Sequence, residues 1–214
     1  MPSRPGQTLR RVWNHEHVPN PVPSGWPPVL LSIDYATQRP ALPESVGDAV
    51  RYAAGQLRLV SAVPDGNRGI AADQTLFRDV IVQAQVSLIA GSDEDLYGLF
   101  LRSPEPDLYY SFAVSPDGQV VVSYYDGAYQ PLVAGPLAPE MPFAKGLGEP
   151  NTLQVVAVGP SLTFYLNGNL VTAEIVDERF EEGFVGFYVH HGSQAPRAEL
   201  GADWIQLRGV FPES

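Results

Sequence analysis

Short runs in which apolar and polar residues alternate are the feature that most constrains this chain. The clearest run extends from Phe77 to Ala90, where one face carries Val80, Val82, Ala84, Val86 and Leu88 and the other carries Gln83, Gln85 and Ser87. A period of two belongs to a strand with one buried and one wet face. The sequence therefore predicts a protein built from strands.

Further strand-like runs follow, and turn residues separate them. The runs are Leu57–Val60, Tyr97–Ser103, Leu108–Ser115, Gln119–Tyr125, Tyr129–Val133, Thr152–Val158, Ser161–Leu166, Leu170–Ile175, Phe184–His190 and Ala198–Val210. Three of the junctions are Asp117-Gly118, Asp126-Gly127 and Asn167-Gly168, dipeptides that readily take positive φ in tight hairpins. Many short strands joined by such turns predict an all-β fold, a two-sheet antiparallel sandwich rather than a parallel α/β sheet.

The beginning of the chain has a different texture. Seven prolines lie between Pro19 and Pro43, and proline cannot donate a hydrogen bond to a sheet ladder. We expect an irregular Pro-rich N-terminal arm over residues 1–23 and a single sandwich domain over residues 24–212. The side chains expected to hold the proline-rich stretch against the body are Trp13, Trp26, Leu30, Leu31 and Ile33. Residues 44–53 are long enough for one helical turn.

Composition excludes several classes of function. The chain has no cysteine, which rules out disulfides, thiolate metal sites and cysteine nucleophiles. Its formal charge is −11 and its nearest approach to a basic cluster is Arg10–Arg11, so no nucleic-acid partner is expected. No run approaches the ~20 apolar residues of a membrane helix, and the N-terminus has no apolar segment typical of a signal peptide. Direct membrane insertion is therefore not expected.

Several segments together resemble a known family. They are Tyr97-Gly98-Leu99-Phe100-Leu101-Arg102, Tyr109-Tyr110-Ser111-Phe112-Ala113-Val114, Pro116-Asp117-Gly118, Pro150-Asn151-Thr152-Leu153-Gln154-Val155, Leu162-Thr163-Phe164-Tyr165-Leu166-Asn167-Gly168, Gly183-Phe184-Val185-Gly186-Phe187 and Asp203-Trp204-Ile205. This series resembles the concanavalin A-like, laminin-G-type jelly rolls of bacterial surface proteins, a group that includes the 3-keto-disaccharide hydrolase family. The resemblance covers roughly residues 24–210 and implies a jelly-roll sandwich and an extracytoplasmic or cell-surface location.

The resemblance to the hydrolase branch is incomplete at the residues that would perform chemistry. Arg102 matches the arginine that in that branch ends a Gly-x-Phe-x-Arg strand on the sugar-facing sheet. The branch has a glutamate where this chain has Ser111, and a tryptophan where it has Pro150. Both the carboxylate and the stacking ring are absent from these positions, so the resemblance implies the fold more strongly than the activity.

No catalytic, metal or cofactor motif stands out from the residues themselves. The Glu-x-Asp-x-Glu strand that would aim carboxylates at a glycosidic bond is missing, and no serine lies in a Gly-x-Ser-x-Gly elbow. The acids Asp93-Glu94-Asp95 and Glu105-Pro106-Asp107 are expected in solvated loops. The pairs His15/His17 and His190/His191 lack a third ligand for a metal. We expect no metal and no cofactor.

Tyrosines are the remaining signal, because sugar rings stack on aromatic faces. The positions out of phase with the core lie on outer sheet faces, and they include Tyr109 and Ser111, Tyr165, and Tyr188 and His190; Arg102 and Tyr125 are added to this set. We predict that Arg102, Tyr109, Ser111, Tyr125, Tyr165, Tyr188 and His190 bind a ligand, and that several of them converge on one concave face.

The leading hypothesis is a non-catalytic module that recognises carbohydrate or another cell-surface ligand, which can be a protein. The alternatives are a glycoside-acting hydrolase of the 3-keto-disaccharide type and a structural subunit of a larger complex. Packing of half-buried sheet surface is the plainer explanation for such tyrosines.

Overall fold

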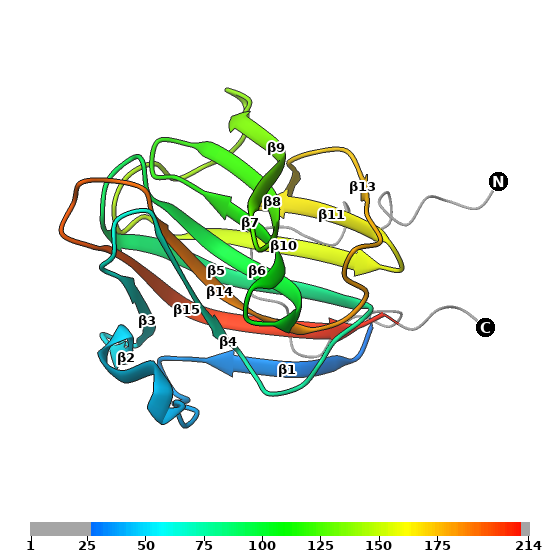
Figure 1. Cartoon of the computed structure of the whole chain (residues 1–214), viewed down its shortest axis with the longest axis horizontal. Coiled ribbons are helices and arrows are strands. Elements are labelled where there is room, and N and C mark those ends of the chain that lie inside the picture. Colours follow the sequence, from blue (N-terminus) through cyan, green and yellow to red (C-terminus); the bar gives the residue numbers. More distant parts are fainter. Residues whose placement is uncertain (1–26, 211–214) are drawn as a thin grey trace.

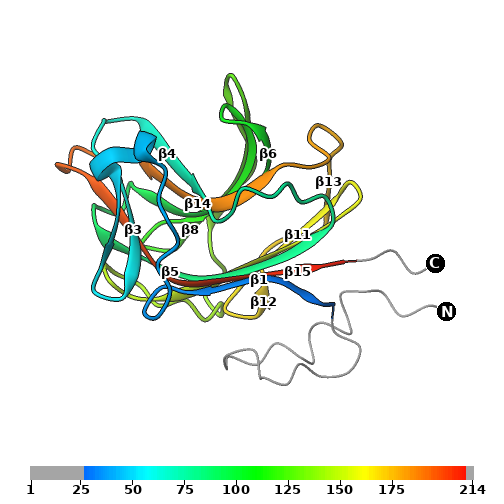
Figure 2. The same ribbon diagram turned by 90° about the horizontal axis from the view of Figure 1, so that it is seen from below.

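Two antiparallel sheets lie face to face in the computed structural model, which describes residues 27–210. Figures 1 and 2 show the two layers, with β4, β14 and β6 over β5, β15 and β1. The first sheet has the order β12-β11-β10-β5-β15-β3-β2. Its strands are β12 (Asn169–Leu170), β11 (Ser161–Leu166), β10 (Asn151–Val158), β5 (Val80–Ala90), β15 (Ala198–Gly209), β3 (Gln56–Ser61) and β2 (Val50–Ala53), with β1 (Val29–Asp34) beside β15 and β13 (Ile175–Val176) beside β11.

The second sheet has the order β4-β14-β6-β7-β8-β9. Its strands are β4 (Gly66–Ala71), β14 (Phe184–His191), β6 (Leu96–Glu105), β7 (Leu108–Val114), β8 (Gln119–Asp126) and β9 (Tyr129–Pro136). The architecture is therefore the predicted all-β, two-sheet antiparallel sandwich. Among residues 27–210 the one helical element is a 3-10 helix, η1 (Glu44–Ala49), and no helix is long and apolar enough to cross a membrane.

The core lies between the sheets and is formed by the apolar phase of each strand. The dry face of β5 is buried throughout, and the ring of Phe112 on β7 contacts that of Phe164 on β11, with centroids 5.1 Å apart. All three predicted hairpins are present, between β7 and β8, between β8 and β9, and between β11 and β12. Positive φ angles at Gly118, Gly127 and Gly168 explain the glycine in each turn.

The structure corrects the sequence analysis at three places. Val29–Asp34 is a strand although the surrounding stretch was expected to be irregular; these six residues contain no proline and pair with the second half of β15. The run at 170–175 is not continuous, because pairing is limited to β12 and β13 at its ends. Gly66–Ala71 was not anticipated, since two of its six residues are glycine. The arm at residues 1–23, Trp13 and Trp26 lie outside the described residues.

Glycine allows close approach of strands in the second sheet. A Cβ atom on Gly186 of β14 would lie 2.0 Å from the carbonyl oxygen of Ile70 on β4, and one on Gly98 of β6 would lie 2.0 Å from that of Phe112 on β7. Only glycine fits where another backbone approaches so closely. The outer face of this sheet, away from the core, carries the cavity described next.

Candidate functional site

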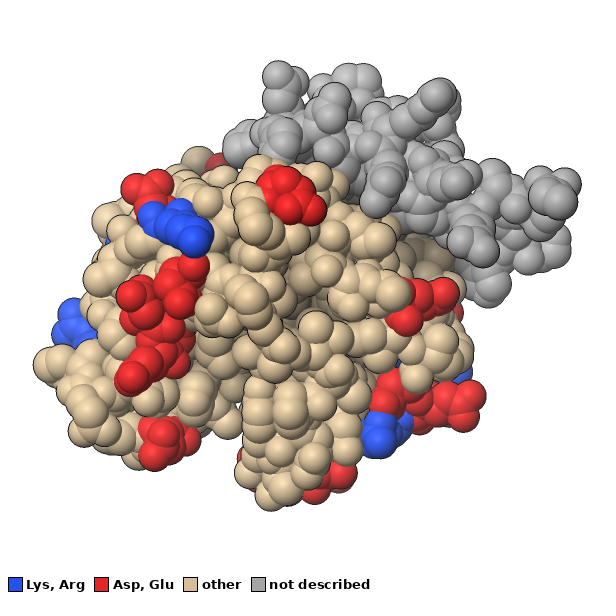
Figure 3. All heavy atoms as spheres, turned by 90° about the horizontal axis from the view of Figure 1, so that it is seen from above, with Lys and Arg blue, Asp and Glu red and all other residues tan. Residues whose placement is uncertain are grey.

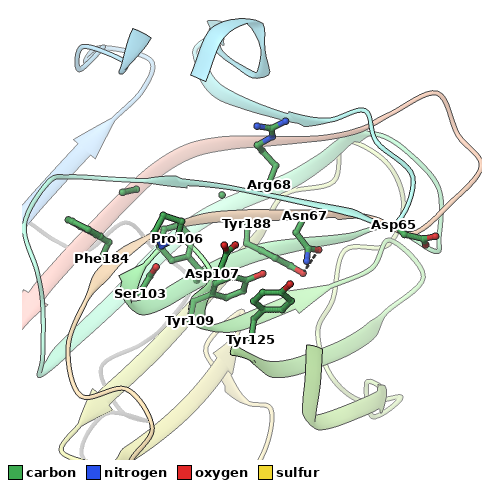
Figure 4. Close-up of a pocket in the computed structure, with 13 residues that line it drawn as sticks. Asp65, Asn67, Arg68, Ser103, Pro106, Asp107, Tyr109, Tyr125, Phe184 and Tyr188 are labelled. Atoms are coloured by element: carbon green, nitrogen blue, oxygen red, sulfur yellow. Dashed lines mark hydrogen bonds between the residues drawn. The ribbon is translucent and has the colours of Figure 1, made fainter. Parts of the chain in front are cut away.

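A cavity of about 550 Å³ lies on the outer face of the second sheet. We call it the outer groove. Its walls come from β4, β14, β6, β7 and β8 and from the β6–β7 turn, and Figure 4 shows the lining side chains: Asp65, Asn67, Arg68, Gly69, Ala71, Phe100, Ser103, Pro106, Asp107, Tyr109, Tyr125, Phe184 and Tyr188.

Strand register brings the rings of the outer groove together. Tyr109 on β7 is paired with Tyr125 on β8, and the two rings are stacked with centroids 5.5 Å apart and an interplanar angle of 14°. Tyr188 on β14 lies 5.9 Å from Tyr109 at a tilt of 52°, and Phe100 on β6 meets Tyr109 edge-on at 6.3 Å. Tyr109 is therefore the centre of the aromatic surface. Tyr109 and Tyr125 are partly exposed, whereas Tyr188 and Phe100 are almost fully buried and form the floor.

Glycine makes room for the floor. Tyr188 is paired with Gly69 on one side and with Gly98 on the other. A Cβ atom on Gly69 would lie 3.3 Å from the ring of Phe100, so glycine at this position leaves room for that ring in the floor.

Asn67 on β4 connects the polar ends of this cluster. Its Oδ1 atom accepts a hydrogen bond from the Tyr188 hydroxyl at 2.9 Å and lies 2.8 Å from Nδ1 of His190. Figure 4 shows the hydroxyls of Tyr188 and Tyr125 turned toward Asn67. Asn67 thus fixes the orientation of Tyr188 and His190 at one end of the outer groove.

Ionisation of these groups is suppressed by burial. Burial, followed by the charges of Tyr125 and Asp107, raises the pKa of Tyr109 to about 12. Burial, followed by Tyr109, raises the pKa of Tyr188 further. Burial lowers the pKa of His190, against the opposing influence of Asp65 and Asp95. At neutral pH the outer groove therefore presents neutral donors and acceptors from these side chains.

The structure brings together Tyr109, Tyr125 and Tyr188 of the predicted set, with His190 joined to them through Asn67. Ser111 faces the same side, but it is buried and its hydroxyl is 2.6 Å from that of Ser123, so it belongs to the sheet packing. Tyr165 is on β11 in the other sheet and is 5% exposed. The expectation that it shares a face with Tyr109 is corrected, because alternation shows that a residue points outward but not from which sheet.

Arg102 does not face the outer groove, which corrects the expectation of a guanidinium beside the tyrosines. Its φ angle is +50°, and the register of β6 shifts at this point, so the side chain turns inward. The guanidinium is 1% exposed and donates to the main-chain carbonyls of Gly159 at 2.6 Å, Arg78 at 3.2 Å and Phe180 at 3.4 Å. Burial lowers its pKa. Arg102 joins three loops at one end of the sandwich.

Several lining residues were missed by the sequence analysis. Asn67 lies on a strand that glycine concealed, and Phe100 lies in a run without clean alternation. Asp107 is an exposed turn residue, as expected of a solvated loop acid, and the β6–β7 turn also places it on the outer groove, which the sequence analysis did not predict. The sequence feature that could have indicated this position is the short connection between two strand-like runs, which keeps Asp107 close to the sheet. Among residues 27–210 no group of three or more histidines or carboxylates is arranged to hold a metal, and His15 and His17 lie outside that range.

Comparison with known proteins adds the family. The model of the 3-keto-alpha-glucoside-1,2-lyase-like domain matches residues 13–198. No curated protein matches the chain in sequence.

Solved structures support the fold. The carbohydrate-binding module CBM66 from Bacillus subtilis is 17% identical, with a TM-score of 0.58 over 72% of this chain and 86% of that one. A Bacillus subtilis protein of unknown function with a galectin-like fold is 12% identical, with a TM-score of 0.61 over 86% of this chain and 97% of that one. The β-glucanase of Bacillus licheniformis is 8% identical, with a TM-score of 0.52 over 77% and 84%. At these identities the likeness establishes a concanavalin A-like sandwich.

Proposed function

We propose that this chain, which belongs to the 3-keto-alpha-glucoside-1,2-lyase-like domain family, is a non-catalytic module that binds carbohydrate in the outer groove. The observation that carries the proposal is the stacked pair Tyr109 and Tyr125 above the floor made by Tyr188. Sugar rings expose flat C–H faces that stack on such rings and leave their hydroxyls for polar neighbours. The structural likeness to a carbohydrate-binding module is consistent with this role.

The test is a binding titration with a matched pair of variants. Tyr125 and Tyr124 are consecutive on β8, but Tyr125 lines the outer groove and Tyr124 packs against the core. We expect malto-, cello-, laminari- or fructo-oligosaccharides to perturb the NMR signals of Tyr109 and Tyr125. Tyr125→Ala should weaken binding about two- to tenfold, the worth of one aromatic contact, while Tyr124→Ala should leave the affinity unchanged. Equal losses in both variants, or no binding to any oligosaccharide, would overturn the proposal.

Asp107 gives a specific reason to keep a second candidate, a lyase acting on 3-keto-glucosides. Figure 4 shows its carboxylate beside the Tyr109 ring, at the mouth of the outer groove. A ketone at C3 of a glucoside acidifies the C2 proton. A carboxylate that removes this proton lets the C2 electrons form a C1–C2 double bond as the C1–O bond breaks, and the departing alkoxide takes up a proton.

The two candidates are separated by turnover. If the protein is a lyase, it releases glucose from 3-keto-trehalose, with growth of the ultraviolet absorbance of the unsaturated ketone, and Asp107→Asn abolishes both. If the protein is a binding module, the wild type yields no product above the buffer blank while oligosaccharide binding persists.

A further inference from the structure

Three charged side chains border the outer groove: Asp65, Arg68 and Asp107. Figure 4 shows that they are not equivalent. The carboxylate of Asp107 lies among the rings, whereas Arg68 extends away from them and Asp65 lies beyond Asn67 at the far end. The charge that a ligand on the tyrosines would meet first is therefore negative.

The position of Asp107 follows from the shape of β6. The pairing of β6 with β7 shifts between Leu101 and Glu105 and resumes at the pair Glu105 and Leu108. Asp107 is in the two-residue turn inside that pair, which lies over the outer face. Its charge is one of the causes, after burial and Tyr125, that raise the pKa of Tyr109 to about 12.

Asp107 is exposed, and no hydrogen bond or ion pair joins it to another residue in the part of the chain that the structure describes. Its two oxygens therefore remain available to a ligand. Of the polar groups nearby, the Tyr188 hydroxyl is already engaged because it donates to Asn67, and the same Asn67 oxygen faces His190.

We propose that Asp107 makes the outer groove selective for uncharged sugars, by accepting hydrogen bonds from sugar hydroxyls and by repelling sugar carboxylates and sulfates. This inference rests on the proposed carbohydrate binding. A carboxylate is an acceptor with two oxygens, which suits adjacent hydroxyls on one ring. Hydrogen bonds to an ionised group are also stronger than those between neutral groups.

The same charge disfavours an anionic ligand. Two like charges about 6 Å apart, at an effective dielectric constant near 40, repel with an energy that corresponds to about a tenfold loss of affinity. The cation that borders the outer groove, Arg68, extends away from the rings (Figure 4), and burial lowers the pKa of His190, so neither places a positive charge among the tyrosines at neutral pH. The whole chain adds to the effect, with a formal charge of −11, and Figure 3 shows acidic side chains spread over one face of the molecule with few basic ones among them.

The experiment uses pairs of sugars that differ only at C6, which carries a neutral hydroxymethyl group in one and a charged carboxylate in the other. Cellotriose and maltotriose are each compared with the same trisaccharide oxidised to carboxylates at C6, by isothermal titration or NMR with the full chain. We expect each neutral trisaccharide to bind at least about tenfold more tightly than its oxidised partner, and added salt to narrow this gap because it screens charge. Asp107→Asn should reduce the gap to about threefold or less, while Asp93→Asn, an exposed acid that does not line the outer groove, should leave it unchanged.

The outcomes separate this inference from the function on which it rests. If none of the malto-, cello-, laminari- or fructo-oligosaccharides binds, the proposed function fails. If the oxidised trisaccharides bind as tightly as the neutral ones, or if Asp107→Asn leaves the gap intact, the groove still binds sugar but Asp107 does not select for charge. The effect of salt on the affinity gap of the wild type is a second test of charge selection, and it does not depend on the folding of a variant.

Discussion

Truncation of Arg102 should damage the fold and spare the outer groove. The guanidinium is buried and donates to three carbonyls, of which only the Gly159 contact is short. Charged hydrogen bonds contribute about 1.5–3 kcal/mol each when well made, and the longer contacts to the carbonyls of Arg78 and Phe180 contribute less. A cavity of about 350 Å³ lies beside Arg102. In the Arg102→Ala variant, water in this cavity can bond to some of the carbonyls that lose their donor, and this offsets part of the lost stability. We therefore expect Arg102→Ala to lower the free energy of unfolding by about 2–4 kcal/mol.

Backbone strain can be separated from the lost hydrogen bonds. Arg102 has a φ of +50°, which glycine adopts at no steric cost and alanine does not. Arg102→Gly should therefore be less destabilised than Arg102→Ala by about 1 kcal/mol, although it removes the same donors. Arg102→Lys should fall between wild type and alanine, because one ammonium cannot reach three loops. Urea denaturation followed by circular dichroism measures all three.

The result that would refute this reasoning is an Arg102→Ala protein within about 0.5 kcal/mol of wild type. The same conclusion would follow if that variant were stably folded but no longer bound oligosaccharide. The first outcome would show that the buried hydrogen bonds contribute little to stability, and the second would show that Arg102 supports ligand binding.

Three further predictions concern the second sheet. The pKa of Tyr109 is about 12 in the folded state and about 10 in the unfolded state, so its contribution to stability is complete below pH 10 and is lost as the pH rises through 12. Urea denaturation between about pH 9 and 11 should show a falling free energy of unfolding, and absorbance at 295 nm should follow the ionisation of tyrosine. Gly186→Ala should cost about 3 kcal/mol or more in urea denaturation, because its Cβ would meet the Ile70 carbonyl, whereas Gly148→Ala, with open space around it, should cost only the ~1 kcal/mol of its positive φ. Asn67→Ala should weaken oligosaccharide binding severalfold, with a stability change of about 1 kcal/mol, because Tyr188 loses its hydrogen-bond acceptor. Gly148→Ala, with a similar cost in stability, is the control, and an equal loss of binding in that variant would show that Asn67 does not orient Tyr188.

Much of the fold could be predicted because the strands are half-buried. The core positions assigned by alternation, including Phe112, Phe164 and Phe187, are fully buried. The hairpin dipeptides also determine which strands are neighbours, and this explains why Tyr109 and Tyr125 could be expected close together. Where the local pattern was weak, as in Gly66–Ala71, tertiary pairing alone makes the strand, and the sequence analysis missed it.

The candidate site was harder to predict, because it depends on non-local pairing. Tyr188 joins Tyr109 through β6 and β14, strands separated by most of the second half of the chain. Tyr165 has the same outward phase as Tyr188 but belongs to the other sheet. Arg102 fits the phase of an outward residue until the backbone shift in β6 turns it inward. Each of these positions is decided by register and by single φ angles that composition does not encode.

The outer face of a sandwich can change its chemistry without disturbing its core, and this chain shows how the two are separated. Tyr124 and Tyr125 are adjacent in sequence, yet one packs against the core and the other borders the outer groove, so we expect substitutions at Tyr125, Asp107 and Asn67 to change the outer groove with little cost to core packing. The structural likeness extends to a binding module and a glucanase, which share the sandwich at 17% and 8% identity. Catalysis or binding must then be decided by a few outward residues. We propose that in this chain the decision falls on Asp107: a carboxylate that only accepts hydroxyl hydrogen bonds suits a lectin-like groove, and the same carboxylate placed against an acidified C–H bond suits a lyase.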